Sequence, residues 1–222
     1  MESHVVKIVS IHQVTHDVKS FRLEKPAGYQ FVPGQATEVS INKPGWEDER
    51  RPFTFTSLND EPTLEFTIKR YTDHNGVTNQ LHQLTEGDEL IIRDVWGAIE
   101  YKGPGYFIAG GAGITPFMAI LRQLHRDKQI ADNILFFSNK TAADIIYEEE
   151  LTSILGKNAR YILTREKKTG YPNMFINIDF LRSEITDFSR HIYVCGPDKM
   201  IADINTALQK LGAQADLLVF ER

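Results

Sequence analysis

One stretch decides how the second half of this chain folds: Tyr106-Phe107-Ile108-Ala109-Gly110-Gly111-Ala112-Gly113-Ile114-Thr115-Pro116. Its first four residues form a short, continuous apolar run, which is typical of a buried strand. Three glycines follow, and the pattern after them predicts a helix over 116–124. Glycines let the backbone approach a ligand closely, and the free amides at a helix start favour negative charge. The stretch therefore predicts a strand, a pyrophosphate-binding loop and a helix in succession.

The loop departs from the common dinucleotide pattern G-x-G-x-x-G, because Pro116 stands in place of the third glycine. A proline suits the first turn of a helix, where its missing N–H costs nothing. The end of the next predicted strand also lacks the acidic residue that often binds ribose hydroxyls, and it reads Ser138-Asn139-Lys140-Thr141. Lys140 is a candidate for binding a 2′-phosphate, and a solvated surface lysine is the alternative.

The second half alternates strands and helices from residue 103 onward. Strands are predicted over 106–109, 133–137, 160–164, 191–195 and 216–220, and helices over 116–124, 142–155, 178–185 and 198–211. This rhythm predicts a doubly wound, five-stranded parallel α/β sheet in the order 3-2-1-4-5. Strands one and four are then neighbours, so the first glycine loop and Cys195-Gly196-Pro197 would line one crevice. The alternative for the second loop is a plain turn beside a buried cysteine.

The first half shows a different rhythm, with short alternating segments separated by turn residues. Strands are predicted over 5–14, 18–24, 36–42, 52–57, 64–71 and 89–95, which indicates a six-stranded antiparallel β-barrel. One helix, over 77–84, interrupts the strands just after Gly76. The change of rhythm puts a domain boundary near Gly103, with one domain over 1–102 and the other over 103–222.

The strand that begins at Arg51 combines a cation, aromatic rings and hydroxyl groups. Such a strand can offer an aromatic wall for a flat ring, a hydroxyl for a ring nitrogen and a guanidinium for a phosphate. Strand alternation predicts that Phe53 and Thr54 point to opposite faces unless a bulge intervenes. Gly76-Val77-Thr78 is a second potential anion site. The alternative for the strand at Arg51 is an aromatic barrel strand without a ligand, and the alternative for Gly76-Val77-Thr78 is a simple glycine turn.

Taken together, five motifs in this order resemble the ferredoxin–NADP reductase superfamily, especially short bacterial flavodoxin reductases and flavin reductases. They are the early barrel turn Phe31-Val32-Pro33-Gly34-Gln35, the flavin motif at Arg51, Phe53 and Thr54 closed by Ser57, the phosphate helix Gly76 to Leu81, the nucleotide loop Gly110 to Pro116, and Tyr193-Val194-Cys195-Gly196-Pro197. The resemblance covers nearly the whole chain.

The resemblance also implies roles for individual residues. Thr54 would bind near flavin N5, Cys195 would lie near the reacting nicotinamide carbon, and Glu221 would match an active-site carboxylate. The cofactor-binding residues would be Arg51, Pro52, Phe53, Thr54, Thr67, Ile68, Lys69, Gly76, Val77, Thr78, Gly110, Gly111, Ala112, Gly113, Ile114, Thr115, Pro116, Asn139, Lys140, Cys195, Gly196 and Pro197. The chain stops at Arg222 without the further aromatic residue that often covers the flavin in this family.

Composition narrows the classes of partner. The chain has 222 residues and a net charge of −5, with no basic run that would suit nucleic acid. No apolar run reaches the length of a membrane span, and no leader pattern precedes the first strand, so a cytoplasmic protein is expected. A single cysteine cannot hold an iron–sulfur cluster, and the seven scattered histidines are expected to be structural or on the surface, without a metal.

The resulting hypothesis is a reductase that takes a hydride from NADPH or NADH onto bound FAD. Electrons would then pass to a separate ferredoxin, flavodoxin or small acceptor. Hydride transfer needs two rings held together in a water-poor space rather than a strong acid or base, which agrees with the lack of a recognisable catalytic triad. FMN in place of FAD, reduction of free flavin, and a non-catalytic regulatory subunit are the alternatives.

Overall fold

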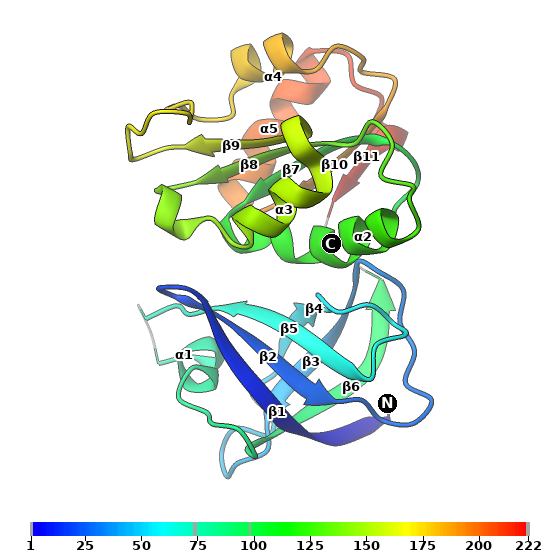
Figure 1. The fold of residues 1–222 in the computed structure, drawn as a ribbon, viewed down its shortest axis with the longest axis vertical. Coiled ribbons are helices and arrows are strands. Elements are labelled where there is room, and N and C mark those ends of the chain that lie inside the picture. Colours follow the sequence, from blue (N-terminus) through cyan, green and yellow to red (C-terminus); the bar gives the residue numbers. More distant parts are fainter. Residues whose placement is uncertain (1, 73–74, 98, 221–222) are drawn as a thin grey trace.

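The chain forms two sheets, one from each half of the sequence. The computed structural model describes residues 2–72, 75–97 and 99–220, and it places the two halves one above the other (Figure 1). Each half has its own apolar core. A third apolar cluster joins α2 (Thr115–Arg126) to Val18 and Ile99 from the first half. The two halves are therefore packed together rather than merely tethered.

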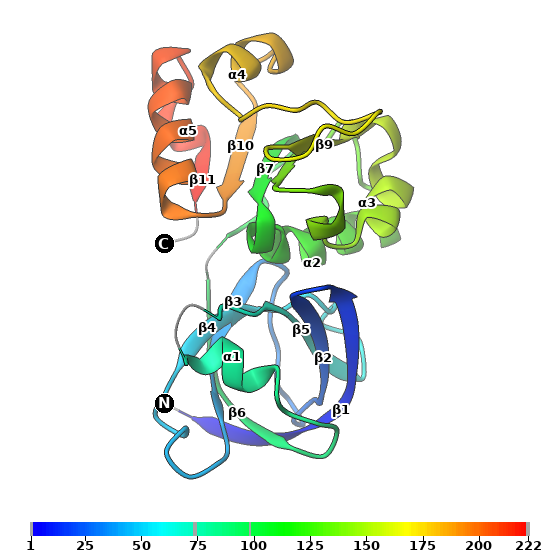
Figure 2. The same cartoon turned by 90° about the vertical axis from the view of Figure 1, so that its left-hand side faces the viewer.

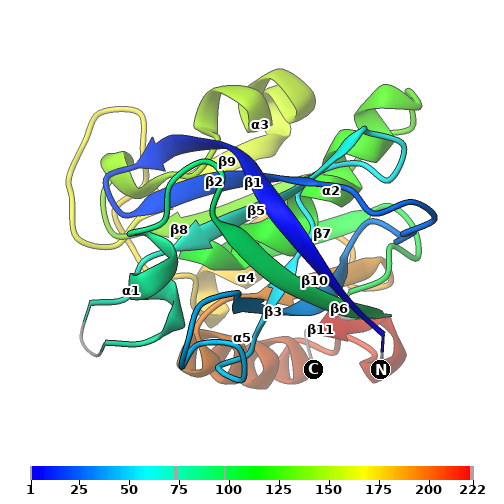
Figure 3. The same cartoon turned by 90° about the horizontal axis from the view of Figure 1, so that it is seen from below.

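The first half is a six-stranded antiparallel barrel, as predicted, with the order β4-β3-β6-β1-β2-β5. Its closing contact is the hydrogen bond from Thr56 N to Glu65 O (2.8 Å), just beyond β4. Figure 3 looks onto this barrel, with β1 crossing in front. Its elements are β1 (Ser3–Thr15), β2 (Val18–Glu24), β3 (Gln35–Ile41), β4 (Arg51–Thr54), β5 (Thr63–Lys69), α1 (Val77–Leu81) and β6 (Glu89–Gly97).

The second half is a five-stranded parallel sheet in the order β11-β10-β7-β8-β9, which confirms the predicted order 3-2-1-4-5. Alternate residues of β7 face opposite sides, so Phe107 packs with α2 and α3 while Tyr106 packs with α4 and α5. Its other elements are β7 (Gly105–Gly110), β8 (Ile134–Asn139), α3 (Glu148–Leu155), β9 (Ala159–Leu163), α4 (Ile178–Glu184), β10 (His191–Cys195), α5 (Asp198–Lys210) and β11 (Leu218–Phe220). None of the helices in the described part of the chain combines the length and apolarity that a membrane crossing needs.

Four predicted elements differ from the observed ones. The helix expected over 142–155 is split, because Thr141 and Asp144 form a capping box on a short 3-10 turn and Tyr147 takes a left-handed conformation (φ 55°) before α3. The strand expected over 52–57 ends at Thr54, since the next amides bond first to β3 and then to β5. The helix expected to reach residue 84 ends at Leu81, and the last strand is shortened by a 3-10 turn over 215–217.

Candidate functional site

A cleft of about 1110 Å³ lies where the two domains meet. Its walls come from β4 and β5 on the barrel side and from the carboxyl ends of β7, β8 and β10 on the other side. The cleft is large enough for a cofactor-sized ligand. Of the residues predicted from the sequence, those that line it are Pro52, Phe53, Thr54, Thr67, Ile68, Lys69, Thr78, Gly110, Gly111, Ala112, Gly113, Thr115, Asn139, Lys140, Cys195, Gly196 and Pro197.

The two glycine loops of the second domain pack directly against each other. A Cβ atom added at Gly113 would lie 2.4 Å from the carbonyl oxygen of Cys195 and 2.6 Å from the backbone nitrogen of Gly196. One added at Gly196 would lie 3.1 Å from the backbone nitrogen of Gly110. The glycines therefore let two loops from neighbouring parallel strands share one surface, as the expected strand order requires.

The barrel wall meets this surface through a pair of threonines. Thr54 Oγ1 donates a hydrogen bond to Thr115 Oγ1 at 3.0 Å, and the side chain of Thr54 is buried. Phe53 and Thr54 both line the cleft, although alternation predicted opposite directions. The early end of β4 explains the difference, because the chain turns from β3 towards β5 directly after Thr54.

Lys69 places a positive charge on the barrel side of the cleft. Its ammonium nitrogen lies 2.6 Å from a carboxylate oxygen of Asp17. Burial raises the pKa of the Asp17 carboxyl, but the hydrogen bond and charge of Lys69 outweigh this effect and hold the pKa below its usual value. Asp17 is therefore anionic, and it keeps the ammonium group at the cleft wall.

Five of the predicted residues that the structure describes do not line the cleft. Arg51 is exposed, donates to the backbone oxygen of Arg50 (2.6 Å) and lies 3.9 Å from a carboxylate oxygen of Glu49. The others in the described structure are Gly76, Val77, Ile114 and Pro116, and the last three are buried. Glu221 falls outside the described residues.

Among the cleft residues that sequence reasoning missed are Tyr71, Arg165 and Phe175. Tyr71 is 47% exposed and Phe175 is 69% exposed, so two large apolar rings face solvent at the cleft. The backbone amide of Arg165 donates to the carbonyl of Lys140 (2.9 Å), which brings two cationic residues to the ends of neighbouring strands. All three lie in irregular segments. Tyr71 and Arg165 closely follow the ends of β5 and β9, and this position was the only sequence signal of a role for them.

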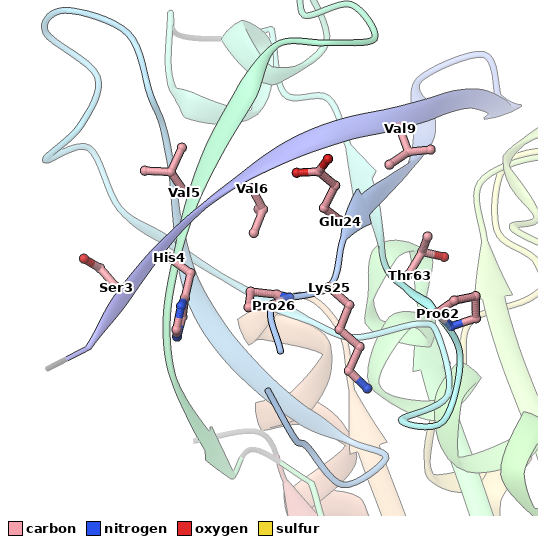
Figure 4. A pocket seen from close by; sticks show the side chains of 10 residues that line it. All are labelled: Ser3, His4, Val5, Val6, Val9, Glu24, Lys25, Pro26, Pro62 and Thr63. Carbon is pink, nitrogen blue, oxygen red and sulfur yellow. The ribbon is translucent and has the colours of Figure 1, made fainter. Parts of the chain in front are cut away.

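A second, smaller hollow of about 690 Å³ lies on the barrel between β1 and the segment after β2. Figure 4 shows its side chains, from His4 and Val9 on β1 to Lys25 and Pro62. None of the predicted site residues lines it. The cleft between the domains is therefore the candidate site.

Comparison with known proteins assigns a family to each half. Residues 5–101 match the oxidoreductase FAD-binding domain, and residues 107–206 match the oxidoreductase NAD-binding domain. FAD and a nicotinamide dinucleotide, expected from the sequence, are thus the ligands that define the two matched families.

Individual relatives agree with this assignment. The chain is 30% identical to the glycine betaine monooxygenase reductase subunit of Pseudomonas aeruginosa, over 94% of this chain and 61% of the relative. It spans about 60% of the length of the curated relatives that it matches.

Solved structures share the fold. The FAD/NAD-binding domain of nitric oxide dioxygenase from Vibrio cholerae superposes with a TM-score of 0.88 at 18% identity, covering 100% of this chain and 98% of that one. A ferredoxin NADP+ reductase from Neisseria gonorrhoeae superposes with a TM-score of 0.83 at 19% identity, covering 96% and 92%. With an FAD-binding barrel followed by an NAD-binding parallel sheet, the chain belongs to the ferredoxin reductase-like superfamily.

Proposed function

We propose that this chain takes a hydride from NADPH or NADH onto FAD held by the barrel and passes the electrons to a separate acceptor protein. The observation that carries the proposal is the contact between the two walls of the cleft. Thr54 of the flavin motif and Thr115 of the nucleotide loop lie 3.0 Å apart, in a cleft lined by both domains. Rings bound on the two walls would approach each other beside this contact, as hydride transfer requires.

The described residues fit both cofactors. Gly111 has a φ of +52° and open space where a side chain would stand, so its backbone is free to approach a pyrophosphate at the start of α2. On the barrel side, Phe53 offers a half-buried ring and Lys69 offers a charge. When bound, a flavin supplies the ability to accept a hydride and to release electrons one at a time.

On the barrel wall, we assign Phe53 to pack against the flavin ring and Thr54 to hydrogen-bond near N5. Thr67, Ile68 and Lys69 continue this wall, and all three line the cleft. Arg51, Gly76, Val77 and Thr78 remain proposed phosphate ligands. Thr78 Oγ1 already accepts a hydrogen bond from the amide of Tyr71 (3.3 Å), which ties α1 to the end of β5.

On the opposite wall, residues 110–116 would cradle the pyrophosphate, and Cys195 would lie beside the nicotinamide. Asn139 ends β8 and Lys140 follows it directly. Both would face the adenosine half of the donor, where a lysine beside Arg165 favours a 2′-phosphate. Glu221 keeps its proposed role as a carboxylate near the flavin. The boundary between the two functional domains is proposed at Gly103.

The acceptor is proposed to be a separate ferredoxin, a flavodoxin or the oxygenase partner of a multicomponent system. Relatives named as reductase components and subunits of monooxygenases support a protein acceptor. A cytoplasmic location remains part of the proposal.

Anaerobic stopped-flow mixing of the FAD-loaded protein with NADPH or NADH tests the proposal. We expect the flavin absorbance to bleach with at least one donor. Thr54→Val should slow bleaching roughly tenfold or more, because the hydroxyl at the contact between the two walls is lost. Thr63→Val, at the far end of β5, is the matched control. No bleaching with either donor would overturn the reductase assignment.

The nature of the flavin needs a separate measurement. We expect FAD to stay bound through dialysis, and mass spectrometry of the extracted cofactor separates FAD from FMN. A colourless protein that oxidises the donor only when riboflavin is added would instead identify a free-flavin reductase.

A further inference from the structure

Helix α2 meets the barrel along one face. Thr115, Arg122 and Arg126 are spaced by seven and then four residues, so they share one side of the helix. Each contacts the barrel: Thr115 bonds to Thr54, Arg122 to Glu65 and Arg126 to Asp60. Figure 1 and Figure 2 both show α2 at the boundary between the domains. This helix follows directly from the glycine loop, so its position also sets the position of that loop.

Arg122 is the less exposed of the two arginines on this face. Its Nη1 donates to Glu65 Oε1 (2.8 Å) and to the backbone oxygen of Thr56 (2.5 Å), both in the barrel. Its Nε and Nη2 donate to the two carboxylate oxygens of Glu150 in α3, at 2.6 and 2.9 Å. The side chains of Arg122 and Glu65 are only 18% and 8% exposed. One guanidinium therefore joins α2, α3 and β5.

The charges of this cluster are held fixed by one another. Burial raises the pKa of the Glu65 carboxyl, but the charge and hydrogen bond of Arg122 outweigh it and hold the pKa below its usual value. Burial lowers the pKa of Arg122, and the hydrogen bond with Glu150 together with the charge of Glu65 raises it well above its usual value. Both groups therefore stay ionised in a setting where solvent screens little.

A chain of hydroxyl groups connects this ion pair to the cleft. Glu65 Oε1 accepts from Thr56 Oγ1 (2.8 Å), which lies 3.1 Å from Thr67 Oγ1 on the cleft wall. Thr67 Oγ1 lies in turn 2.9 Å from the hydroxyl of Tyr147. The centre of the Tyr147 ring lies 5.1 Å from the Arg122 guanidinium, so the chain of contacts leads back to the ion pair from which it started.

Tyr147 holds this place in a left-handed conformation that is costly for a residue other than glycine. A strained backbone persists where the surrounding contacts determine it. The contacts of Tyr147 include the hydroxyl of Thr67 in the barrel and the guanidinium of Arg122 in its own domain.

We propose that Arg122, Glu65 and Tyr147 form an interdomain clasp that sets the distance between the two cofactor walls. Arg122 and Tyr147 are then positioning residues, because they act through α2 and Thr67 rather than by touching a reacting atom. The inference rests on the proposed function, since it assigns to the clasp the geometry of hydride transfer. Displacement of reacting groups by about 1 Å can cost about a hundredfold in rate, so a clasp of this kind controls rate more than affinity.

The test compares Arg122→Met, Arg122→Lys and Tyr147→Phe, with Arg126→Met as the matched control. Arg126 lies on the same helix face and also bonds to the barrel, but its pair with Asp60 is exposed. Two readouts are taken on FAD-loaded protein: the limiting rate of flavin bleaching with its dependence on donor concentration, and hydrogen–deuterium exchange of β5 and α2.

We expect Arg122→Met to lower the limiting rate about tenfold or more, with the donor dissociation constant within about twofold of wild type. Arg122→Lys should recover part of the rate, because lysine keeps the positive charge but lacks the planar guanidinium that bonds to Glu65 and Glu150 at once. Exchange should rise in β5 and α2 for Arg122→Met and not for Arg126→Met. A limiting rate equal to that of Arg126→Met, or a change confined to the dissociation constant, would overturn the clasp.

Two further outcomes are also decisive. If Arg122→Met does not fold, Tyr147→Phe, which removes a single hydroxyl, should still slow bleaching by about threefold at unchanged affinity, and an unchanged rate would overturn the clasp. If neither donor bleaches the wild-type flavin, the proposed function fails. The clasp is then tested by hydrogen–deuterium exchange of β5 and α2 alone. Equal exchange in Arg122→Met and Arg126→Met then rejects it.

Discussion

At the scale of single residues, Gly113 sets how closely the two nucleotide loops pack. A side chain there would have to displace the backbone around Cys195, which cannot move as a flexible side chain does. We expect Gly113→Ala to raise the dissociation constant for NADPH or NADH by about tenfold or more, since the loops must separate. FAD content should stay unchanged. Calorimetric titration of both donors measures the effect.

Gly97→Ala is the control for this substitution, because an added Cβ at Gly97 meets nothing within 4 Å and its φ is ordinary. Donor binding by Gly113→Ala as tight as that of Gly97→Ala would contradict the role of the paired loops.

His82 makes stability depend on pH. Its Nε2 lies 2.8 Å from the carbonyl oxygen of Ile68 on the cleft wall, and its ring is packed against Phe21. Burial lowers the pKa of this imidazole, and the hydrogen bond to Ile68 only partly offsets that effect. Because the folded pKa lies below the unfolded value of 6.5, the stabilisation by the neutral ring is present above pH 6.5 and is lost as the pH falls through the folded pKa.

We therefore expect the free energy of unfolding to fall below pH 6.5, and to fall less steeply in His82→Gln. Urea unfolding over a series of pH values measures this. His125→Gln, an exposed position at the end of α2, should keep the wild-type slope. Parallel pH profiles for wild type and His82→Gln would argue against the prediction.

At the scale of elements, β10 is tied to the segment that links the domains. The buried hydroxyl of Tyr193 donates to the carbonyl of Gly103 (2.7 Å) and accepts from the amides of Lys102 (2.9 Å) and Gly103 (3.0 Å). Burial raises the pKa of Tyr193 to about 12, so the phenol remains a donor across the physiological range.

Tyr193→Phe should lower the free energy of unfolding by about 1–3 kcal/mol, because it leaves backbone groups of the linking segment without a partner. Chemical denaturation gives this difference. Tyr106→Phe is the control, since the Tyr106 hydroxyl has only a 3.4 Å contact with Thr186. If the two variants lose the same free energy of unfolding, the hydrogen bonds of Tyr193 to the linking segment do not contribute to stability.

The elements themselves were largely predictable, and the exceptions have local causes. The alternation of Leu64 to Lys69 and the apolar run of 106–109 both led to strands within two residues of the observed ones. The helix predicted over 142–155 failed where Asp144 caps a shorter turn and Tyr147 turns the chain. Helical periodicity cannot detect such a break, because the apolar positions keep their spacing on either side.

At the scale of the whole molecule, the two domains share apolar contacts as well as the clasp. Val18 of β2 and Ile99 are buried in the same cluster as Phe117 and Ile120 of α2. We expect one cooperative unfolding transition. Both tryptophans, Trp46 and Trp96, lie in the barrel, so their fluorescence reports on one domain while far-UV circular dichroism reports mainly on the helices of the other.

The midpoints of the two signals in urea should coincide. Val18→Ala should lower both together, because the shared cluster loses methyl groups. Barrel fluorescence that changes well before the helical signal would show that the domains unfold independently.

The sequence by itself determined the order of the strands and helices, the two glycine loops and the families of cofactor. The elements and the loops rest on residues close together in the chain, through periodicity, turn chemistry and the free amides at a helix start, whereas the cofactor families rest on the resemblance that the five motifs carry. Only the tertiary structure decided which side chains meet across the cleft. Glu65 lies in β5, Arg122 in α2 and Tyr147 just before α3, and in the sequence alone none of them stands out as an interface residue. Their partnership follows from burial at the interface, where an ionised group must find its counter-charge in whatever element packs against it.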